Sequence, residues 1–341
     1  MIEKYNLLEH IRSRPGMYIG ALNDYGYEEL LNYLITDFIM LDIYEFTFSL
    51  KKDNQLIIEV SGHKTFLPIV NALKDLHNYQ DNIFYLSLAG IVALSEFSSF
   101  EMNGKCILRS KKGSPEILED TDDHTLNRIK IEFTPDKEIF KDLIVSYDCL
   151  NELFKRFCFL NPQIKIKSID ESKFEKQINF FHYKNGLAEI IEYELKKNAL
   201  YISPVFKLDF QKDTEFSYSL ALAFVEDYGL KLNKIKVYAN YKETILGGSL
   251  LDGIFQGLKK FFKEESLKRN LKLSVTNAKL RKYLFIYASV KGELVYLGSV
   301  KWKLGTPKVQ TEIRKFVYDE LKLYFTHKDE EIFEILKILQ E

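Results

Sequence analysis

An α+β fold is predicted, because segments with the two-residue period of strands and segments with the 3.6-residue period of helices follow one another without strict β-α-β alternation. The clearest hairpin pattern, at 44–60, joins two strands directly, and the clearest helix pattern, at 28–43, has a broad apolar face. With 341 residues, 46% of them hydrophobic, the chain is long enough for about two domains with a core each.

The first half of the chain opens with an expected helix at 5–13, which ends at Arg14-Pro15-Gly16 because proline and glycine do not continue a helix cheaply. In the hairpin, strands at 44–51 and 56–60 are joined by a turn at Asp53-Asn54. Further strands are expected at 105–110, 128–134 and 163–169, a helix at 148–160, and a buried helix or strand pair at 83–94.

The second half begins near Leu200 and also mixes strands with helices. Strands are expected at 216–224, 234–239 and 283–291, and helices at 253–270 and 311–325. We find no internal repeat, low-complexity tract or long Gly/Ser linker between the halves. Two packed domains are therefore expected.

The composition excludes several classes of protein. The 48 basic and 49 acidic side chains leave a formal net charge of −1, which excludes a strongly basic, dedicated nucleic-acid binder. Cys106, Cys149 and Cys158 are odd in number and form no C-x-x-C pair, which argues against a disulfide framework and a zinc site. The amino end is charged, and no stretch approaches 18 uninterrupted apolar residues. A cytoplasmic location and no membrane partner are expected.

A run of seven residues, Arg14-Pro15-Gly16-Met17-Tyr18-Ile19-Gly20, closely resembles the opening of the ATPase region of type IIA topoisomerases, the family of DNA gyrase B and of the corresponding ATPase subunit of topoisomerase IV. Weaker motifs follow in the family's order, and the resemblance spans essentially the whole chain. They are LFKRFCFLN at 153–161, F-H-Y at 181–183 with Gly186, Gly247-Gly248-Ser249, and S-V-K at 289–291.

The resemblance implies a Bergerat (GHKL) ATPase-like α/β sandwich at 1–197 and a transducer domain of ribosomal-S5 type at 198–341. In the family, ATP closes a dimer of these regions around DNA, and the chain then continues into a metal-binding cleavage (TOPRIM) domain. Because this sequence stops with the transducer, we expect no cleavage domain and not a complete topoisomerase subunit. The family's amino-terminal arm is also mostly missing, so a monomer or a nucleotide-independent homodimer is expected.

The family's ATP pocket needs a carboxylate that activates water, an oxygen ligand for Mg²⁺, and an aspartate that accepts the adenine amino proton. It also needs glycines, because only a bare backbone can bring its N–H groups against phosphates. Counting from Gly20 without a gap places Leu34 at the general-base glutamate, Asp37 at the helix aspartate and Phe38 at the magnesium asparagine. Of these, only Asp37 is unchanged.

The remaining pocket positions also differ from the family. Gly62 falls at the adenine-binding aspartate, Lys64 and Phe66 at the two glycines of the turn, Ile129 at the base-contacting threonine, and Thr306 near the lysine of the Q-T-K loop. The phosphate loop, expected between 77 and 95, carries bulky side chains such as Tyr85 instead of three glycines. We therefore expect a filled pocket with no catalytic residue, no bound ATP and no metal.

Two changes of register stay open. Shifting the helix by five residues puts Glu29 and Asn32 near the active positions, but this shift does not restore the glycines. A slip near Thr306 would leave Lys303 or Lys308 in the place of the loop lysine.

A basic run on the helix expected at 253–270 is the candidate DNA contact. It consists of Lys259, Lys260, Lys263, Lys268 and Arg269, opposed nearby only by Glu264 and Glu265. An ordinary solvated helix face is the other interpretation. In a clamp of the family's kind, such a run would meet phosphates and give weak, non-specific binding to DNA.

Together these patterns predict a catalytically degenerate gyrase B-like protein that acts through protein contacts as a scaffold, regulator or mimic linked to DNA topology. Its partner could be a topoisomerase-like subunit. Two alternatives remain. One is an ATP-binding subunit of a type II DNA topoisomerase-like complex, which requires a working pocket with ATP and Mg²⁺. The other is a DNA clamp that closes without nucleotide.

Overall fold

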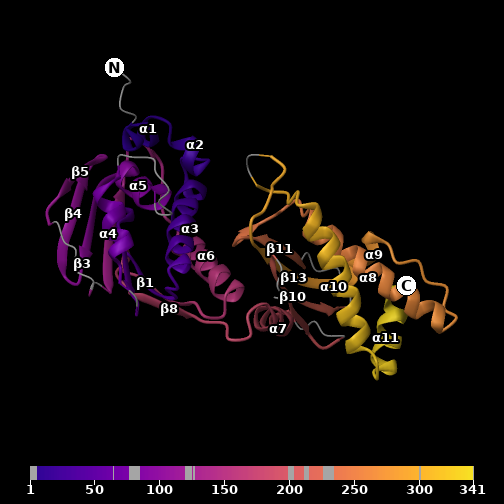
Figure 1. Ribbon diagram of the computed structural model, residues 1–341. Coiled ribbons are helices and arrows are strands. Elements are labelled where there is room, and N and C mark those ends of the chain that lie inside the picture. The colour runs from indigo at the N-terminus through magenta and orange to yellow at the C-terminus, as the bar shows by residue number, and fades with distance from the viewer. Residues whose placement is uncertain are drawn as a thin grey trace, which may run out of the picture. The chain divides into compact units, whose positions relative to one another are not determined.

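The structure is a computed structural model that describes residues 6–63, 65–76, 85–119, 125, 127–198, 203–210, 215–225, 234–298 and 301–340 (Figure 1). The chain divides into two compact units. Unit 1 comprises Met1–Cys158 and Gln163–His182, and unit 2 comprises Phe159–Pro162 and Tyr183–Glu341. The boundary expected at 197/198 differs from this division, because the helix α7 (Leu187–Lys197) packs against strands of unit 2.

Unit 1 is built on an eight-stranded sheet with the order β5-β4-β3-β6-β2-β1-β7-β8. Neighbouring strands are antiparallel except β1 and β7, which are parallel. The strands are β1 (Glu45–Leu50), β2 (Leu56–Ser61), β3 (Ser95–Met102), β4 (Lys105–Lys111), β5 (Ser114–Ile117), β6 (Arg128–Pro135), β7 (Lys165–Asp170) and β8 (Gln177–Phe181).

Helices cover one face of this sheet. They are α1 (Leu7–Ser13), α2 (Pro15–Ile19), α3 (Asp24–Met40), α4 (Leu67–Lys74), α5 (Tyr85–Leu94) and α6 (Tyr147–Leu160), with a short 3-10 turn at Lys52–Asn54. Phe154 of α6 stacks on Phe48 of β1 with ring centroids 4.2 Å apart. Side chains of β1 and β2 that alternate with this buried set, such as Glu45 and Glu59, are exposed on the other face. The result is the expected α/β sandwich.

Unit 2 contains a five-stranded sheet with the order β12-β11-β13-β10-β9. Its strands are β9 (Phe206–Phe210), β10 (Ser217–Phe224), β11 (Ile235–Ala239), β12 (Lys242–Glu243) and β13 (Leu284–Lys291). Its helices are α7, α8 (Ser249–Lys268), α9 (Asn277–Tyr283), α10 (Pro307–Tyr324) and α11 (Asp329–Gln340).

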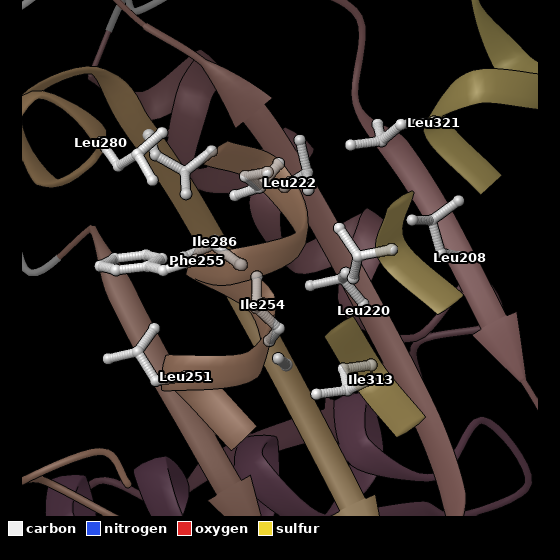
Figure 2. Close-up of a cluster of buried hydrophobic side chains, with 14 of the residues drawn as sticks. Leu208, Leu220, Leu222, Leu251, Ile254, Phe255, Leu280, Ile286, Ile313 and Leu321 are labelled. Carbon is white, nitrogen blue, oxygen red and sulfur yellow. The ribbon is translucent and has the colours of Figure 1, made fainter. Parts of the chain in front are cut away.

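The core of unit 2 lies between its sheet and the helices α8 and α10. In Figure 2, Leu220 and Leu222 of β10 lie against Ile254 of α8 and Ile313 of α10, and all four side chains are fully buried. The two helices approach at Gly253, where a Cβ atom would stand 2.4 Å from Ile313 Cγ2 and 2.5 Å from the Gln310 carbonyl oxygen. Glycine is required at this crossing because any side chain would push the helices apart.

Several elements differ from the sequence prediction. Arg14-Pro15-Gly16 breaks the first helix, but Pro15 also begins α2, where its missing N–H costs nothing. The segment left open at 83–94 contains the helix α5 and not a strand pair. The long helix begins at Ser249, before the expected Gly253. In the described part of the chain, no helix is both long and apolar enough to cross a membrane.

Candidate functional site

The helix α3 places the three counted positions of the expected nucleotide pocket in the core of unit 1. Asn23 caps this helix, because its side chain accepts the Tyr25 N–H at 3.1 Å. Leu34 and Phe38 are 0% exposed. The Phe38 ring makes an edge contact with Phe46 of β1, with centroids 6.0 Å apart. The two residues that were counted to the general base and the magnesium ligand are therefore packed apolar side chains of the core.

The turn after β2 packs against the same part of the core. Phe66 is 0% exposed, and its ring centroid lies 6.4 Å from that of Phe38. A Cβ atom at Gly62 would stand 3.0 Å from the Phe66 ring and 3.4 Å from Ile43, so an aspartate there requires the ring to move. The Gly62 N–H donates to the Asn127 carbonyl at 2.9 Å. Lys64 and the side chain of Tyr85 lie outside the described residues.

Asp37, the residue that was counted to the family's helix aspartate, faces α5. Its carboxylate accepts a 2.5 Å hydrogen bond from the Ser87 hydroxyl, and both residues are buried. Burial raises the pKa of Asp37 to about 7, although the Ser87 hydrogen bond acts in the opposite direction. Asp37 is therefore a partly protonated core residue near neutral pH.

This burial predicts a pH dependence of stability. Because the folded pKa of Asp37 lies above its unfolded value, its contribution is complete below about pH 4 and is lost as pH rises towards about 7. Asp37→Asn cannot ionise, so the pH profile of its unfolding free energy should be flatter by up to about 1.4 kcal/mol per pH unit in that window. Urea unfolding of both proteins between pH 4 and 7 measures the difference. Parallel profiles would contradict the prediction.

The alternative register concerns Glu29 and Asn32, which lie earlier on α3 and are also buried, at 9% and 7% exposure. The Asn32 Oδ1 atom has no hydrogen-bond partner among the described residues. The alternative register stays a prediction, and the unpartnered amide oxygen of Asn32 favours it.

Ile129 and Thr306 both serve as structural residues. Ile129 is 2% exposed and pairs with Val60 of β2 and Met102 of β3. Thr306 precedes α10, and its hydroxyl oxygen accepts the Val295 N–H at 3.0 Å. Two lysines were alternatives to Thr306 for the loop lysine. Lys303 is exposed in the loop before α10, and Lys308, in the first turn of α10, forms an ion pair with Glu215 at 2.7 Å.

The basic run on α8 is partly neutralised. Lys268 and Arg269 both pair with Glu265 at 2.5 Å, and Arg269 also pairs with Asp329 of α11 at 2.5 Å. The Lys260 ammonium lies 4.0 Å from the Tyr318 ring centroid. Within the part of the chain that the structure describes, Lys259 and Lys263 form no ion pair.

A cavity that the sequence did not indicate lies on the open face of the large sheet, opposite the helices. It measures about 670 Å³ and is lined by charges of both signs, among them Glu59, Arg128 and Lys130. Such alternating charges are typical of cross-strand pairs on a solvated sheet face. The described residues hold no group of three or more His, Cys, Asp or Glu side chains that could bind a metal ion.

Comparison with known proteins agrees with this fold. Residues 186–341 match the family model of DNA gyrase B. The DNA gyrase B protein of Clostridium acetobutylicum is 27% identical over 93% of this chain and 54% of its own length. The chain is similar to DNA gyrase B. The type 2 topoisomerase B protein of Aquifex aeolicus is 24% identical over 94% of this chain and 44% of its own length. The chain thus spans about half the length of these relatives.

Solved structures extend the likeness to the fold of the whole chain. The gyrase B structure from Myxococcus xanthus has a TM-score of 0.81 at 17% identity and covers 98% of this chain and 99% of its own. The 43K ATPase domain of Thermus thermophilus gyrase B, solved with an aminocoumarin, has a TM-score of 0.76 at 19% identity, with 98% and 95% coverage. At these identities the likeness establishes the gyrase B-type fold alone.

Proposed function

We propose that this chain is a gyrase B-like protein that does not use ATP and that acts through protein contacts, as a scaffold, regulator or mimic linked to DNA topology. The proposal rests mainly on the full burial of Leu34, Phe38 and Phe66, the residues that counting along the sequence assigns to the general base, the magnesium ligand and a turn glycine. A protein partner is favoured because the relatives are named as subunits of larger enzymes.

Each replacement removes a different part of the chemistry. Leucine has no group that can accept a proton from water, so Leu34 cannot serve as a general base. Phenylalanine offers no oxygen to Mg²⁺, so Phe38 cannot replace the asparagine. The Phe66 ring fills space beside Gly62, where the adenine aspartate is expected. Loss of all three leaves no means of binding or activating the nucleotide at this place.

Steady-state ATP hydrolysis tests the proposal, with the Thermus thermophilus 43K ATPase domain as the active reference. We expect no turnover above the buffer background, with or without duplex DNA. Turnover by this chain would refute the proposal. If that turnover also disappears in Glu29→Ala and Asn32→Ala but survives in Leu34→Ala, the alternative register of an ATP-binding topoisomerase-like subunit is correct.

The DNA clamp is the weaker alternative, because ion pairs already occupy Lys268 and Arg269. With two or three free lysines, duplex affinity should fall only about tenfold to a hundredfold between 50 and 200 mM salt, rather than the three to five decades of a full phosphate-binding surface. Lys259→Glu combined with Lys263→Glu should abolish this weak binding, measured by fluorescence anisotropy. The matched control combines Lys141→Glu with Lys184→Glu, which makes the same change of charge at two residues outside α8. Equal loss in both double variants would contradict a role of α8.

A further inference from the structure

The edge strand β8 of the large sheet is unlike the other sheet edges. Among the described strands, β5 and β8 form the edges of the eight-stranded sheet, and β9 and β12 those of the five-stranded sheet. Folded proteins usually protect such edges with charged residues or proline, because the free backbone groups otherwise pair with another chain. Three edges follow this rule: β5 contains Pro115 and Glu116, β9 contains Lys207 and Asp209, and β12 is Lys242–Glu243.

The strand β8 has no such protecting residue. Its sequence from Gln177 to Phe181 is QINFF, with neither a charged residue nor a proline. Ile178 and Phe180 lie on one face of the strand, opposite Ile169 and Lys167 of β7. They are 47% and 73% exposed, although the Lys167 ammonium lies 5.6 Å from the Phe180 ring centroid. Apolar side chains and a neutral, unpaired edge therefore coincide in one strand.

We propose that β8 pairs with β8 of a second copy of this chain, so that the two large sheets join antiparallel across a twofold axis. The argument for a second copy is complementarity. A twofold contact brings the same strand against itself, so a strand that pairs in this way must be compatible with its own side chains. The strand QINFF meets this condition, because it has no charged residue that the pair would bury and its exposed Ile178 and Phe180 can cover one another.

The register of the pair follows from the strand length. Asn179 is the central residue of β8, and antiparallel pairing centred on it places Ile178 of each copy opposite Phe180 of the other. Aromatic and β-branched side chains that face each other across antiparallel strands stabilise a sheet. The two exposed apolar residues would thus each cover one in the second copy. This dimer does not depend on the proposed function, because it involves no residue of the nucleotide position.

Light scattering over a range of micromolar concentrations tests the dimer. We expect a dimer for the unmodified chain, with and without an ATP analogue, and a monomer for Ile178→Lys and for Phe180→Lys, because each change would bury a lysine ammonium against an apolar side chain of the second copy. Ile144→Lys is the matched control, because Ile144 is 79% exposed and lies in a loop outside β8. A monomeric unmodified chain, dimeric β8 variants, or dissociation by Ile144→Lys would each overturn the proposal.

Disulfide trapping tests the register without relying on a destabilised edge. In a background with Cys106→Ser and Cys149→Ser, we mix Ile178→Cys protein with Phe180→Cys protein and oxidise. The proposed register brings these two positions together, so the mixture should form a cross-linked dimer, and each variant alone should form much less. Equal cross-linking in the mixture and in the separate samples, or none in any sample, would show that the strands do not pair in this way.

Discussion

Truncation of Phe38 to alanine should lower the free energy of unfolding of unit 1 by about 3–5 kcal/mol, the usual cost of removing a buried aromatic ring. Phe38 is 0% exposed and contacts both Phe46 and Phe66, so no neighbour can collapse into the cavity without losing its own packing. Phe38→Asn, which restores the residue type of the magnesium ligand, should also be strongly destabilising because its amide would be buried without partners.

Two signals separate the units in this experiment. Circular dichroism follows the whole chain, whereas the fluorescence of Trp302, the single tryptophan, follows unit 2. Phe174→Ala is the control, since the Phe174 side chain is fully exposed and its removal should change stability by no more than about 0.5 kcal/mol. A similarly small effect of Phe38→Ala would mean that the region around Phe38 is open rather than packed.

Replacement of Asp136 by alanine should cost about 3 kcal/mol, because it leaves the Arg12 guanidinium without its partner in a partly buried site. Arg12 of α1 forms an ion pair with Asp136 at the end of β6 and donates to the Ala93 carbonyl at 2.9 Å. These contacts attach α1 to the sheet. Glu138→Ala is the control, since its pair with Lys112 is exposed and should contribute less than about 1 kcal/mol.

The same pair predicts an acid-dependent loss of stability. Burial tends to raise the pKa of Asp136, but hydrogen bonds from Arg12 and from the Glu138 N–H outweigh it, so the net pKa is lowered. A lowered folded pKa contributes stability that is present above the unfolded value of about 3.9 and is lost as pH falls through the folded pKa. Unfolding at acid pH should therefore show a steeper decline for the unmodified chain than for Asp136→Asn. Identical acid profiles would contradict the assignment.

Local patterns were sufficient for the elements that position the site. The apolar spacing predicted the helix that contains Leu34 and Phe38, and the structure extends it back to Asp24 because Asn23 provides the cap. The Asp53-Asn54 turn was also predicted correctly, and both residues have positive φ. The strand β8 was missed because it has only five residues, although its first four alternate polar and apolar side chains.

Contacts between residues far apart in the sequence could not be predicted from local patterns. Counting along the helix placed Asp37, but not the Ser87 hydroxyl that binds it. The basic run was judged against neighbouring acids alone, whereas Arg269 also pairs with Asp329, sixty positions away. The spacing of apolar residues along a helix or strand shows which of its faces is buried. Which residue of another element contacts that face depends on tertiary packing.

Calorimetric titration with a non-hydrolysable ATP analogue in the presence of Mg²⁺ shows most directly whether the proposed nucleotide position is filled. We expect no saturable heat and no change in melting temperature at millimolar analogue. A functional pocket at about 100 times its dissociation constant would instead add about 2.7 kcal/mol of stability. Saturable binding, accompanied by such an increase in stability, would contradict the account.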